Sequence, residues 1–256
     1  MTAASQDQYP ATERIPGRDV VAAFDFDGTL TRGGSVWQFL TAICGRETVV
    51  TAGIALSPKL VRAALFGGRA TDDAKEALFV RTLAGRPAEE VARSAAEFGV
   101  AHYRRRNRTK VRARLDWHRR QGHRVVVVSA SPECYVEAAA GELGVDGVVA
   151  TRLEVDRNGK LTGHFAGGNC RGERKRDRLL QWMVSSSDRR RGGEGTFVGA
   201  LPEVQDKGRP YLWAYGNSAG DLQMLEEADI GVDAGRLGRF GKLRRFRRLG
   251  DVLTAW

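Results

Sequence analysis

Short apolar runs alternate with long amphipathic stretches along this chain. Residues 20–24, Val-Val-Ala-Ala-Phe, form an apolar run that leads directly into a polar segment containing Gly28. An apolar run of this length bounded by a turn is typical of a buried strand. Residues 125–128 are four consecutive valines, apolar on both faces, which favours a central strand of a parallel sheet. Residues 211–215 predict a third strand.

Residues 35–121 predict helices almost throughout. Apolar side chains recur there at three- and four-residue spacing, as at Val36, Leu40 and Ile43, and glycines separate the helical segments. Further predicted elements are helices over 132–143, 171–184 and 221–228, strands at 148–150 and 229–232, and a hairpin over 153–165. Strands that alternate with helices predict an α/β fold: a Rossmann-like parallel sheet with a helical cap inserted after the first strand.

The predicted elements divide the chain into a core, a cap and three polar segments. The core domain comprises 20–34 and 122–235, and the cap domain 35–121. Residues 1–19 are polar, contain two prolines and lack the apolar stretch of a signal peptide, so they predict a disordered leader. Residues 185–209 begin with three serines and continue into Arg and Gly, which predicts a flexible insertion within the core. Residues 236–256 form a basic C-terminal tail.

The composition argues against a membrane-spanning protein and a zinc- or disulfide-stabilised fold, and it favours anionic partners. No run of 18 apolar residues occurs, so no membrane-spanning helix is predicted. The three cysteines and four histidines lack the spacing of a zinc site or a disulfide framework, and a cytoplasmic location fits. The net charge is +10, and only seven of the 41 basic residues are lysine. A basic surface favours anionic partners, although a codon bias toward arginine would give the same excess.

Polar side chains follow the predicted strands at the points where the strands end: Asp25 and Asp27, then Ser129, then Asn217 and Asp221. Ligands of parallel sheets bind at this edge. Two close carboxylates repel unless a proton or a cation lies between them, and Mg²⁺ prefers oxygen ligands. With Lys175 as a positive charge, these groups are suited to holding a phosphoryl group. Each residue alone also fits a turn, a helix cap or a solvated helix face.

Taken in order, these segments resemble four motifs of one family. Asp25-Phe26-Asp27-Gly28-Thr29-Leu30-Thr31 is similar to motif I of the haloacid dehalogenase (HAD) superfamily phosphatases. Ser129-Ala130-Ser131-Pro132 resembles motif II, Lys175 the lysine of motif III, and Gly216-Asn217-Ser218-Ala219-Gly220-Asp221 motif IV. The resemblance covers about residues 20–232. The helical insert after motif I resembles the cap of the phosphoserine phosphatase-like subgroup, subfamily IB.

The resemblance implies a role for each matching residue. Asp25 is the nucleophile that forms an aspartyl-phosphate, and Asp27 is the general acid and then the base. The remaining roles implied are phosphoryl binding by Ser129, Ala130 and Lys175, a Mg²⁺ site on Asp25, Asp27, Asn217 and Asp221, and substrate binding by Arg81 in the cap. The function expected is that of a Mg²⁺-dependent phosphatase acting on a small phosphorylated substrate of unknown identity.

Two positions depart from the family pattern. Asn217 stands where motif IV usually has an aspartate, so it offers the metal an amide oxygen without a charge. Gly34 stands near the position where phosphoserine phosphatases carry a glutamate that grips the substrate ammonium. Glycine cannot do so, and phosphoserine is therefore disfavoured as the substrate.

Two other functions remain open from the sequence. A lipid phosphate such as phosphatidylglycerophosphate is an alternative substrate, because residues 49–66 are apolar with basic interruptions and the tail mixes Arg with Leu and Phe. Such segments lie on anionic membranes, here the inner membrane face, although a solvated C-terminal helix packed by its few apolar residues is the favoured explanation of the tail. A non-catalytic basic binding protein on the same scaffold is the alternative of another class. Nucleic acid is a disfavoured partner, because no motif for it is visible.

Overall fold

A computed structural model describes residues 19–190, 209–235, 243 and 245–253, without the side chains of 188–190. A seven-stranded sheet runs through it in the order β4-β3-β2-β1-β5-β6-β7. The strands are β1 (Val20–Phe24), β2 (Arg124–Pro132), β3 (Gly147–Val155), β4 (Leu161–Ala166), β5 (Tyr211–Gly216), β6 (Ile230–Asp233) and β7 (Arg247–Arg248). Only β4 is antiparallel to its neighbour.

The central strand β1 is buried along its whole length, as its uninterrupted apolar sequence predicts. Val21 pairs with Arg124 of β2 on one side and with Leu212 of β5 on the other, all in parallel register. The carboxyl ends of β1, β2 and β5 therefore lie at one edge of the sheet. The predicted α/β fold with a parallel sheet is confirmed.

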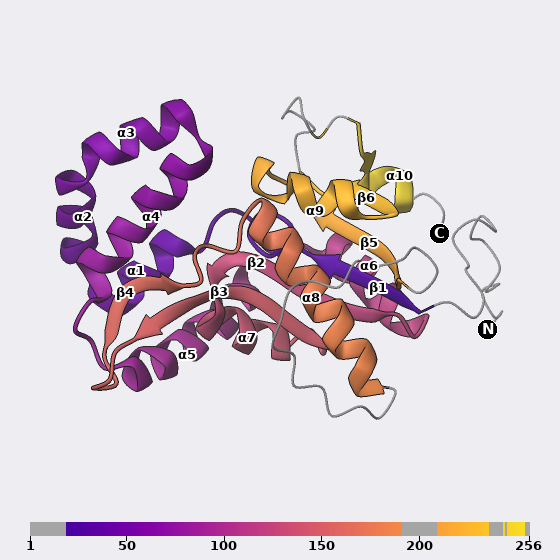
Figure 1. Cartoon of the computed structure of the whole chain (residues 1–256), viewed down its shortest axis with the longest axis horizontal. Helices are drawn as coiled ribbons and strands as arrows, with labels where there is room; N and C mark the ends of the chain where they lie inside the picture. Colours follow the sequence, from indigo (N-terminus) through magenta and orange to yellow (C-terminus); the bar gives the residue numbers. More distant parts are fainter. Residues whose placement is uncertain (1–18, 191–208, 236–242, 244, 254–256) are drawn as a thin grey trace.

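Helices cover both faces of this sheet. Phe24 and Val127 face α5 (Ala88–Arg106), α6 (Thr109–Arg120) and α7 (Glu133–Gly141), whereas Ala23 and Val128 face α8 (Glu173–Arg190) and α9 (Leu222–Glu227). Four further helices, α1 (Val36–Cys44), α2 (Arg46–Ala55), α3 (Ser57–Phe66) and α4 (Gly68–Leu83), stand beyond β4, away from the central strands (Figure 1). Within the predicted cap segment 35–121, α5 packs along α7 of the core.

Strand β3 is longer than its sequence predicts. The stretches 148–150 and 153–155, predicted as separate strands, form one strand that pairs first with β2 and then with β4. The change of partner falls between Thr151 and Arg152, which keeps the backbone extended across the junction. The predicted hairpin turn is present, because Asp156 Oδ1 accepts from the backbone N–H groups of Asn158 and Lys160.

Helix α8 continues beyond the predicted boundary at 184 and overlaps the predicted insertion 185–209. The hydroxyls of Ser185, Ser186 and Ser187 each donate to the carbonyl four residues earlier, at 3.0, 2.7 and 2.8 Å. Arg124, buried at the start of β2, donates to Ser186 and Ser187. These bonds keep the polar serines helical. Residues 191–208 of the insertion lie outside the described residues, and Arg209 at its end pairs with Glu227 at 3.2 Å.

The described part of the predicted tail packs on the sheet edge. Strand β7 pairs with β6, and α10 (Leu249–Leu253) follows it. Leu243, Leu249 and Val252 are buried. Residues 1–18 of the predicted leader 1–19 and the other tail residues lie outside the described ranges. Asp19 is described, and its carboxylate accepts from Arg124 Nε at 3.1 Å.

Within the described ranges, no single helix has the length and apolar character to cross a membrane. The consecutive helices α2 and α3 meet those two criteria only when taken together, and they are bent by 70° relative to each other.

A buried aromatic and histidine cluster lies beneath β1 and β5. The ring of Tyr215 stacks on Phe24 at 4.3 Å, and its hydroxyl lies 2.8 Å from both Arg114 Nε and His118 Nε2. His118 Nδ1 lies 2.8 Å from His123 Nδ1. Burial, with the nearby Arg114 charge, holds the pKa of His118 well below its usual range and lowers the pKa of His123 to about 4.

We expect acidification to destabilise the fold through this histidine pair. The folded pKa lies below the unfolded value, so this stability is complete above about pH 6.5 and is lost as pH falls toward 4. The lowered pKa of His123 alone should reduce the free energy of unfolding by about 1–2 kcal/mol at pH 5 relative to pH 7.5. Urea unfolding at pH 7.5 and pH 5 measures the loss, which His123→Asn should reduce. The control His164→Asn alters an exposed histidine and should keep the wild-type loss; equal losses in both variants would contradict the assignment.

Candidate active site

The carboxyl ends of β1, β2 and β5 bring the predicted motif residues to one place. Asp25 directly follows β1, and its backbone N–H donates to Tyr215 O at 2.9 Å, which extends the β1–β5 ladder by one bond. Asn217 follows β5, and Ser129 lies within the carboxyl half of β2. The sheet register thus aligns residues that lie about 100 and 190 positions apart in the sequence.

A buried ammonium joins two buried carboxylates at this edge. Lys175 Nζ, from the first turn of α8, lies 2.6 Å from Asp25 Oδ1 and 2.5 Å from Asp221 Oδ1. Burial alone would lower the pKa of Lys175, but the Asp221 and Asp25 charges outweigh it and raise that pKa. Burial, together with the Asp221 charge, raises the pKa of Asp25 to about 7 despite Lys175. The positive charge of Lys175 therefore offsets only part of the cost of burying the charged Asp25 carboxylate near Asp221. A further cation beside Asp25 would stabilise its charged form.

Asp221 organises the loop after β5. Its Oδ2 accepts from the backbone N–H groups of Asn217 and Ser218 at 3.1 and 2.9 Å and from Ser218 Oγ at 2.8 Å. Burial opposes the charge of Asp221, but Lys175 and Ser218 outweigh it and lower its pKa. A Cβ at Gly216 would overlap the Asp221 side chain. With both oxygens engaged, Asp221 orients Lys175 and Asn217.

The Asn217 amide lies between three oxygen atoms. One end of the amide is 3.0 Å from Asp25 Oδ2, 3.0 Å from the Asp27 carbonyl oxygen and 3.1 Å from Thr29 Oγ1. Hydrogen bonding places the NH₂ group at that end, since two of the three neighbours only accept. A Cβ at Gly28, where φ is +84°, would overlap this amide, so the turn of motif I leaves room for Asn217.

The same donor set fits a hard divalent cation. With the amide turned by half a rotation, a carboxylate oxygen, a carbonyl oxygen and an amide oxygen converge, which are the donor types that Mg²⁺ takes. The set contains one carboxylate side chain, with a backbone carbonyl and an amide as the other donors, and the described residues contain no cluster of three or more His, Cys, Asp or Glu that could hold a metal. Asp25, the Asp27 carbonyl and Asn217 are therefore the residues suited to holding Mg²⁺.

Hydroxyl groups of Ser35, Ser131 and Thr31 donate to the Asp27 carboxylate. Asp27 Oδ2 accepts from Ser35 Oγ at 2.7 Å and from Ser131 Oγ at 2.6 Å. Tyr135 OH lies 2.6 Å from Ser35 Oγ. Ser131 stands two residues after Ser129 in the motif II match, which is a usable signal; Ser35 and Tyr135 carry none. The hydroxyls fix the direction of the Asp27 carboxyl group.

Hydrogen bonds hold the motif II backbone from both sides. Ser129 Oγ accepts from the Ser131 N–H at 3.0 Å, which leaves the hydroxyl proton of Ser129 free to donate elsewhere. The Ala130 carbonyl accepts from Thr151 Oγ1 at 2.7 Å and from Lys75 Nζ at 2.6 Å. Ser129 is buried, so its orientation is set by these bonds rather than by solvent.

Lys75 is the residue of α4 that reaches this site. Its ammonium also donates to Asn169 Oδ1 at 2.9 Å and lies 5.1 Å from the centre of the Phe165 ring. Burial lowers the pKa of Lys75 to about 8, although Asp27 and Asp72 act in the opposite direction. The sequence held one signal for it, since Lys75 is one of few lysines in a chain whose basic residues are mostly arginine.

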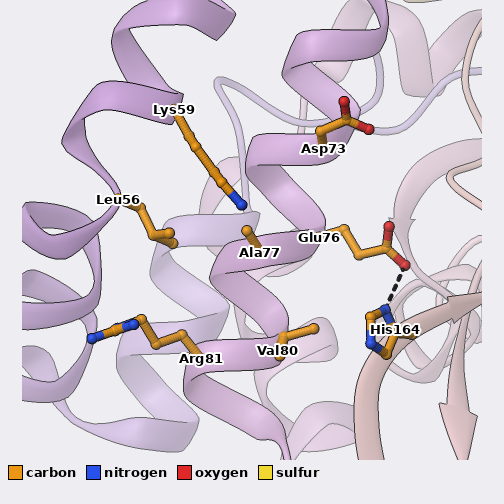
Figure 2. Close-up of a pocket in the computed structure, with 8 residues that line it drawn as sticks. All are labelled: Leu56, Lys59, Asp73, Glu76, Ala77, Val80, Arg81 and His164. Atoms are coloured by element: carbon orange, nitrogen blue, oxygen red, sulfur yellow. Dashed lines mark hydrogen bonds and ion pairs between the residues drawn. The ribbon is translucent and has the colours of Figure 1, made fainter.

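The structure does not bring Arg81 together with the other predicted site residues. Arg81 is exposed on α4 and lines a pocket of about 500 Å³ between α3 and α4, which Lys59, Glu76 and His164 also line from other sides (Figure 2). No residue of the four motifs lines this pocket. Helical periodicity places Lys75 and Arg81 on different sides of α4, and the side toward motif II carries Lys75.

Comparison with known proteins identifies the family of this chain. The family described as haloacid dehalogenase-like hydrolase matches residues 22–226. Protein CicA of Caulobacter vibrioides (strain NA1000 / CB15N) is 30% identical over 220 residues, which cover 86% of this chain and 88% of CicA. A crystal structure of a Bordetella pertussis Tohama I protein of unknown function covers 90% of this chain and 98% of its own, with 21% identity and a TM-score of 0.67.

A phosphoserine phosphatase solved in complex with substrate has the same fold. It is 18% identical, covers 93% of this chain and 98% of its own, and gives a TM-score of 0.54. The chain thus belongs to the haloacid dehalogenase-like hydrolase family, and its fold is that of the phosphoserine phosphatase-like members.

Proposed function

We propose that the protein is a Mg²⁺-dependent phosphatase that hydrolyses a phosphate monoester through an aspartyl-phosphate intermediate. One observation carries the proposal: Asp25 lies between the Lys175 ammonium on its Oδ1 side and the Asn217 amide on its Oδ2 side. A buried carboxylate flanked by a cation and a cation-binding donor set is suited to attack a phosphorus atom whose negative charge would otherwise repel it.

In the first step, Asp25 attacks phosphorus and the bond from phosphorus to the ester oxygen breaks. Lys175 and the free hydroxyl proton of Ser129 bind the phosphoryl oxygens, together with the backbone at Ala130. Asp27 in its acid form gives its proton to the leaving alcohol. The hydroxyls of Ser35 and Ser131 hold the Asp27 carboxyl group in place for that transfer.

In the second step, Asp27 accepts a proton from water as the water attacks the phosphorus atom of the aspartyl-phosphate. The bond from Asp25 to phosphorus breaks, inorganic phosphate leaves, and Asp27 is again protonated for the next cycle. When bound, Mg²⁺ would neutralise charge on the phosphoryl group. Asp221 acts through Lys175 and Asn217, so we assign it a positioning role.

At position 34 the protein has no carboxylate that could bind an ammonium group of the substrate. Gly34 has no side chain, and a Cβ built there meets no atom within 4 Å, so the space remains open to a different substituent. A panel of phosphate monoesters assayed with Mg²⁺ and with EDTA tests the function. We expect Mg²⁺-dependent phosphate release; a complete lack of turnover would instead favour the non-catalytic binding protein.

The Asn217→Asp variant tests the metal site. An added carboxylate should tighten Mg²⁺ binding, so half-maximal activity should occur at roughly tenfold lower Mg²⁺. Without Mg²⁺, the variant brings a second carboxylate against Asp25, and its melting temperature in EDTA should fall and be restored by Mg²⁺. Mg²⁺ titrations of activity and of thermal unfolding measure both effects.

Asn158→Asp is the matched control, since it makes the same change in the exposed turn between β3 and β4. Its two titrations should superimpose on those of the wild type. Identical curves for Asn217→Asp and the wild type would remove Asn217 from the metal site and leave it as a capping residue.

A further inference from the structure

Helix α3 turns a large apolar surface toward solvent. None of its residues is buried, and α3 with the end of α2 leaves Ile54, Val61, Leu65 and Phe66 between 58 and 75% exposed. Seven of the eight large apolar side chains with high exposure in the described residues lie on α1–α3. Single exposed apolar side chains are common on proteins, but a concentration of this kind marks an interaction surface.

The geometry of this α3 surface favours a flat partner. α3 packs against α2 and α4 and lies at the outer edge of the molecule, away from the central strands (Figure 1). Val61 and Leu65 are four residues apart and lie on one side of the helix, with Phe66 next to them. The bend of 70° between α2 and α3 disfavours a span across a membrane and favours a helix that lies on one.

Basic side chains border the apolar ones. Lys59, Arg62 and Arg69 are exposed, and within the described part of the chain none of the three forms an ion pair. No acidic residue occurs between Ser57 and Thr71. An apolar helix face bordered by Lys and Arg is the composition of helices that lie in the headgroup region of anionic membranes. A second copy of this chain would present the same positive charges and be repelled.

We propose that the α3 surface docks the protein on an anionic membrane, with Val61, Leu65 and Phe66 inserted at the boundary between headgroups and acyl chains. Lys59, Arg62 and Arg69 then contact lipid phosphates. Lys59 also borders the pocket between α3 and α4 (Figure 2). This interaction is separate from the phosphatase function, and it uses the cap rather than the C-terminal tail.

Co-sedimentation of the full-length protein with vesicles tests the proposal. The wild type should bind phosphatidylglycerol-containing vesicles and bind pure phosphatidylcholine vesicles much more weakly. The triple variant Val61→Ser/Leu65→Ser/Phe66→Ser changes only exposed positions, and its affinity for these vesicles should fall by about tenfold or more. Val155→Ser, the matched control, changes an exposed valine on β3 and should bind as the wild type does. Asp25→Asn should also bind normally, which separates docking from catalysis.

A charge variant gives a second measurement that leaves the apolar residues intact. Lys59→Gln/Arg62→Gln should weaken binding about fivefold for each charge removed at low salt, whereas Arg120→Gln/Arg157→Gln removes the same charge elsewhere and should have little effect. Wild-type binding by the triple variant would overturn the proposal and assign membrane binding to another segment. Loss of self-association in the triple variant, with vesicle binding unchanged, would instead identify a second copy as the occupant.

Discussion

Replacement of Asp25 by asparagine should lower kcat by about 10⁴-fold or more, the usual scale for loss of a covalent nucleophile. The asparagine side chain has the same shape, and its oxygen can still accept from Lys175, but an amide does not attack phosphorus. Steady-state phosphate release measures the loss. Mass spectrometry of acid-quenched protein should find one phosphoryl group on the peptide that contains Asp25 in the wild type, and none in the variant.

The matched control is Asp73→Asn, which removes the same charge from an exposed position on α4. It should retain activity within about twofold, because exposed substitutions remote from a site are nearly neutral. Circular dichroism should show both variants folded. An Asp25→Asn protein that kept as much as about a tenth of the wild-type rate would contradict covalent catalysis by Asp25.

Replacement of Asp27 by asparagine should lower turnover of an alkyl phosphate by about 10²–10⁴-fold, the usual contribution of a general acid–base residue. The first step with an aryl phosphate should be affected less, because a phenolate leaves without a proton. In the second step, the attacking water would still lack Asp27 as the base that accepts its proton. The variant should therefore release one equivalent of phenol rapidly and then turn over slowly, which stopped-flow absorbance measures.

Ser35→Ala provides the comparison for Asp27. It removes one of the two hydroxyls that donate to Asp27 Oδ2 but keeps the carboxyl group. We expect a loss of about tenfold, the usual cost of one hydrogen bond, similar for both substrates and without a burst. Equal losses for alkyl and aryl phosphates in Asp27→Asn, with no burst, would show that Asp27 is not the acid and base.

The sequence predicts the fold and the centre of the site because both depend on local patterns. Apolar runs followed directly by polar residues identify the carboxyl ends of strands, and the parallel sheet then brings those ends to one edge. Asp25, Ser129 and Asn217 meet for that reason alone. The helical face of Lys175 is less determined, and its assignment depended on the family resemblance.

The surroundings of the site could not be predicted because they depend on packing between distant elements. Ser35, which donates to Asp27, meets Tyr135 although 100 residues separate the two, and no periodicity encodes that contact. In α4, the alternation of apolar and polar positions predicts a helix but not which side faces motif II. Arg81 matched a family segment, whereas the contact is made by Lys75, six positions earlier.

The sequence pattern predicts α8 and β3 shorter than they are, for related reasons. Three serines have weak intrinsic helix preference, yet their hydroxyls bond within α8 and to Arg124, a tertiary contact that extends the helix. Likewise β3 continues through Thr151 and Arg152 because it exchanges a parallel neighbour for an antiparallel one. In both cases long-range pairing overrides the local signal.

The bond from Lys75 to the Ala130 carbonyl links the position of α4 to the motif II segment that carries Ser129. Lys75 belongs to α4, whereas Ala130 belongs to the strand that carries Ser129, so any displacement of α4 from the sheet breaks this bond and leaves Thr151 as the remaining donor to that carbonyl. A bound phosphate that ordered Ser129 and its neighbour Ala130 would then favour the position of α4 in which Lys75 makes this bond. By thermodynamic reciprocity, whatever holds α4 in that position would raise the affinity for phosphate by the same factor. Retention of phosphate and the position of α4 would then be one coupled quantity.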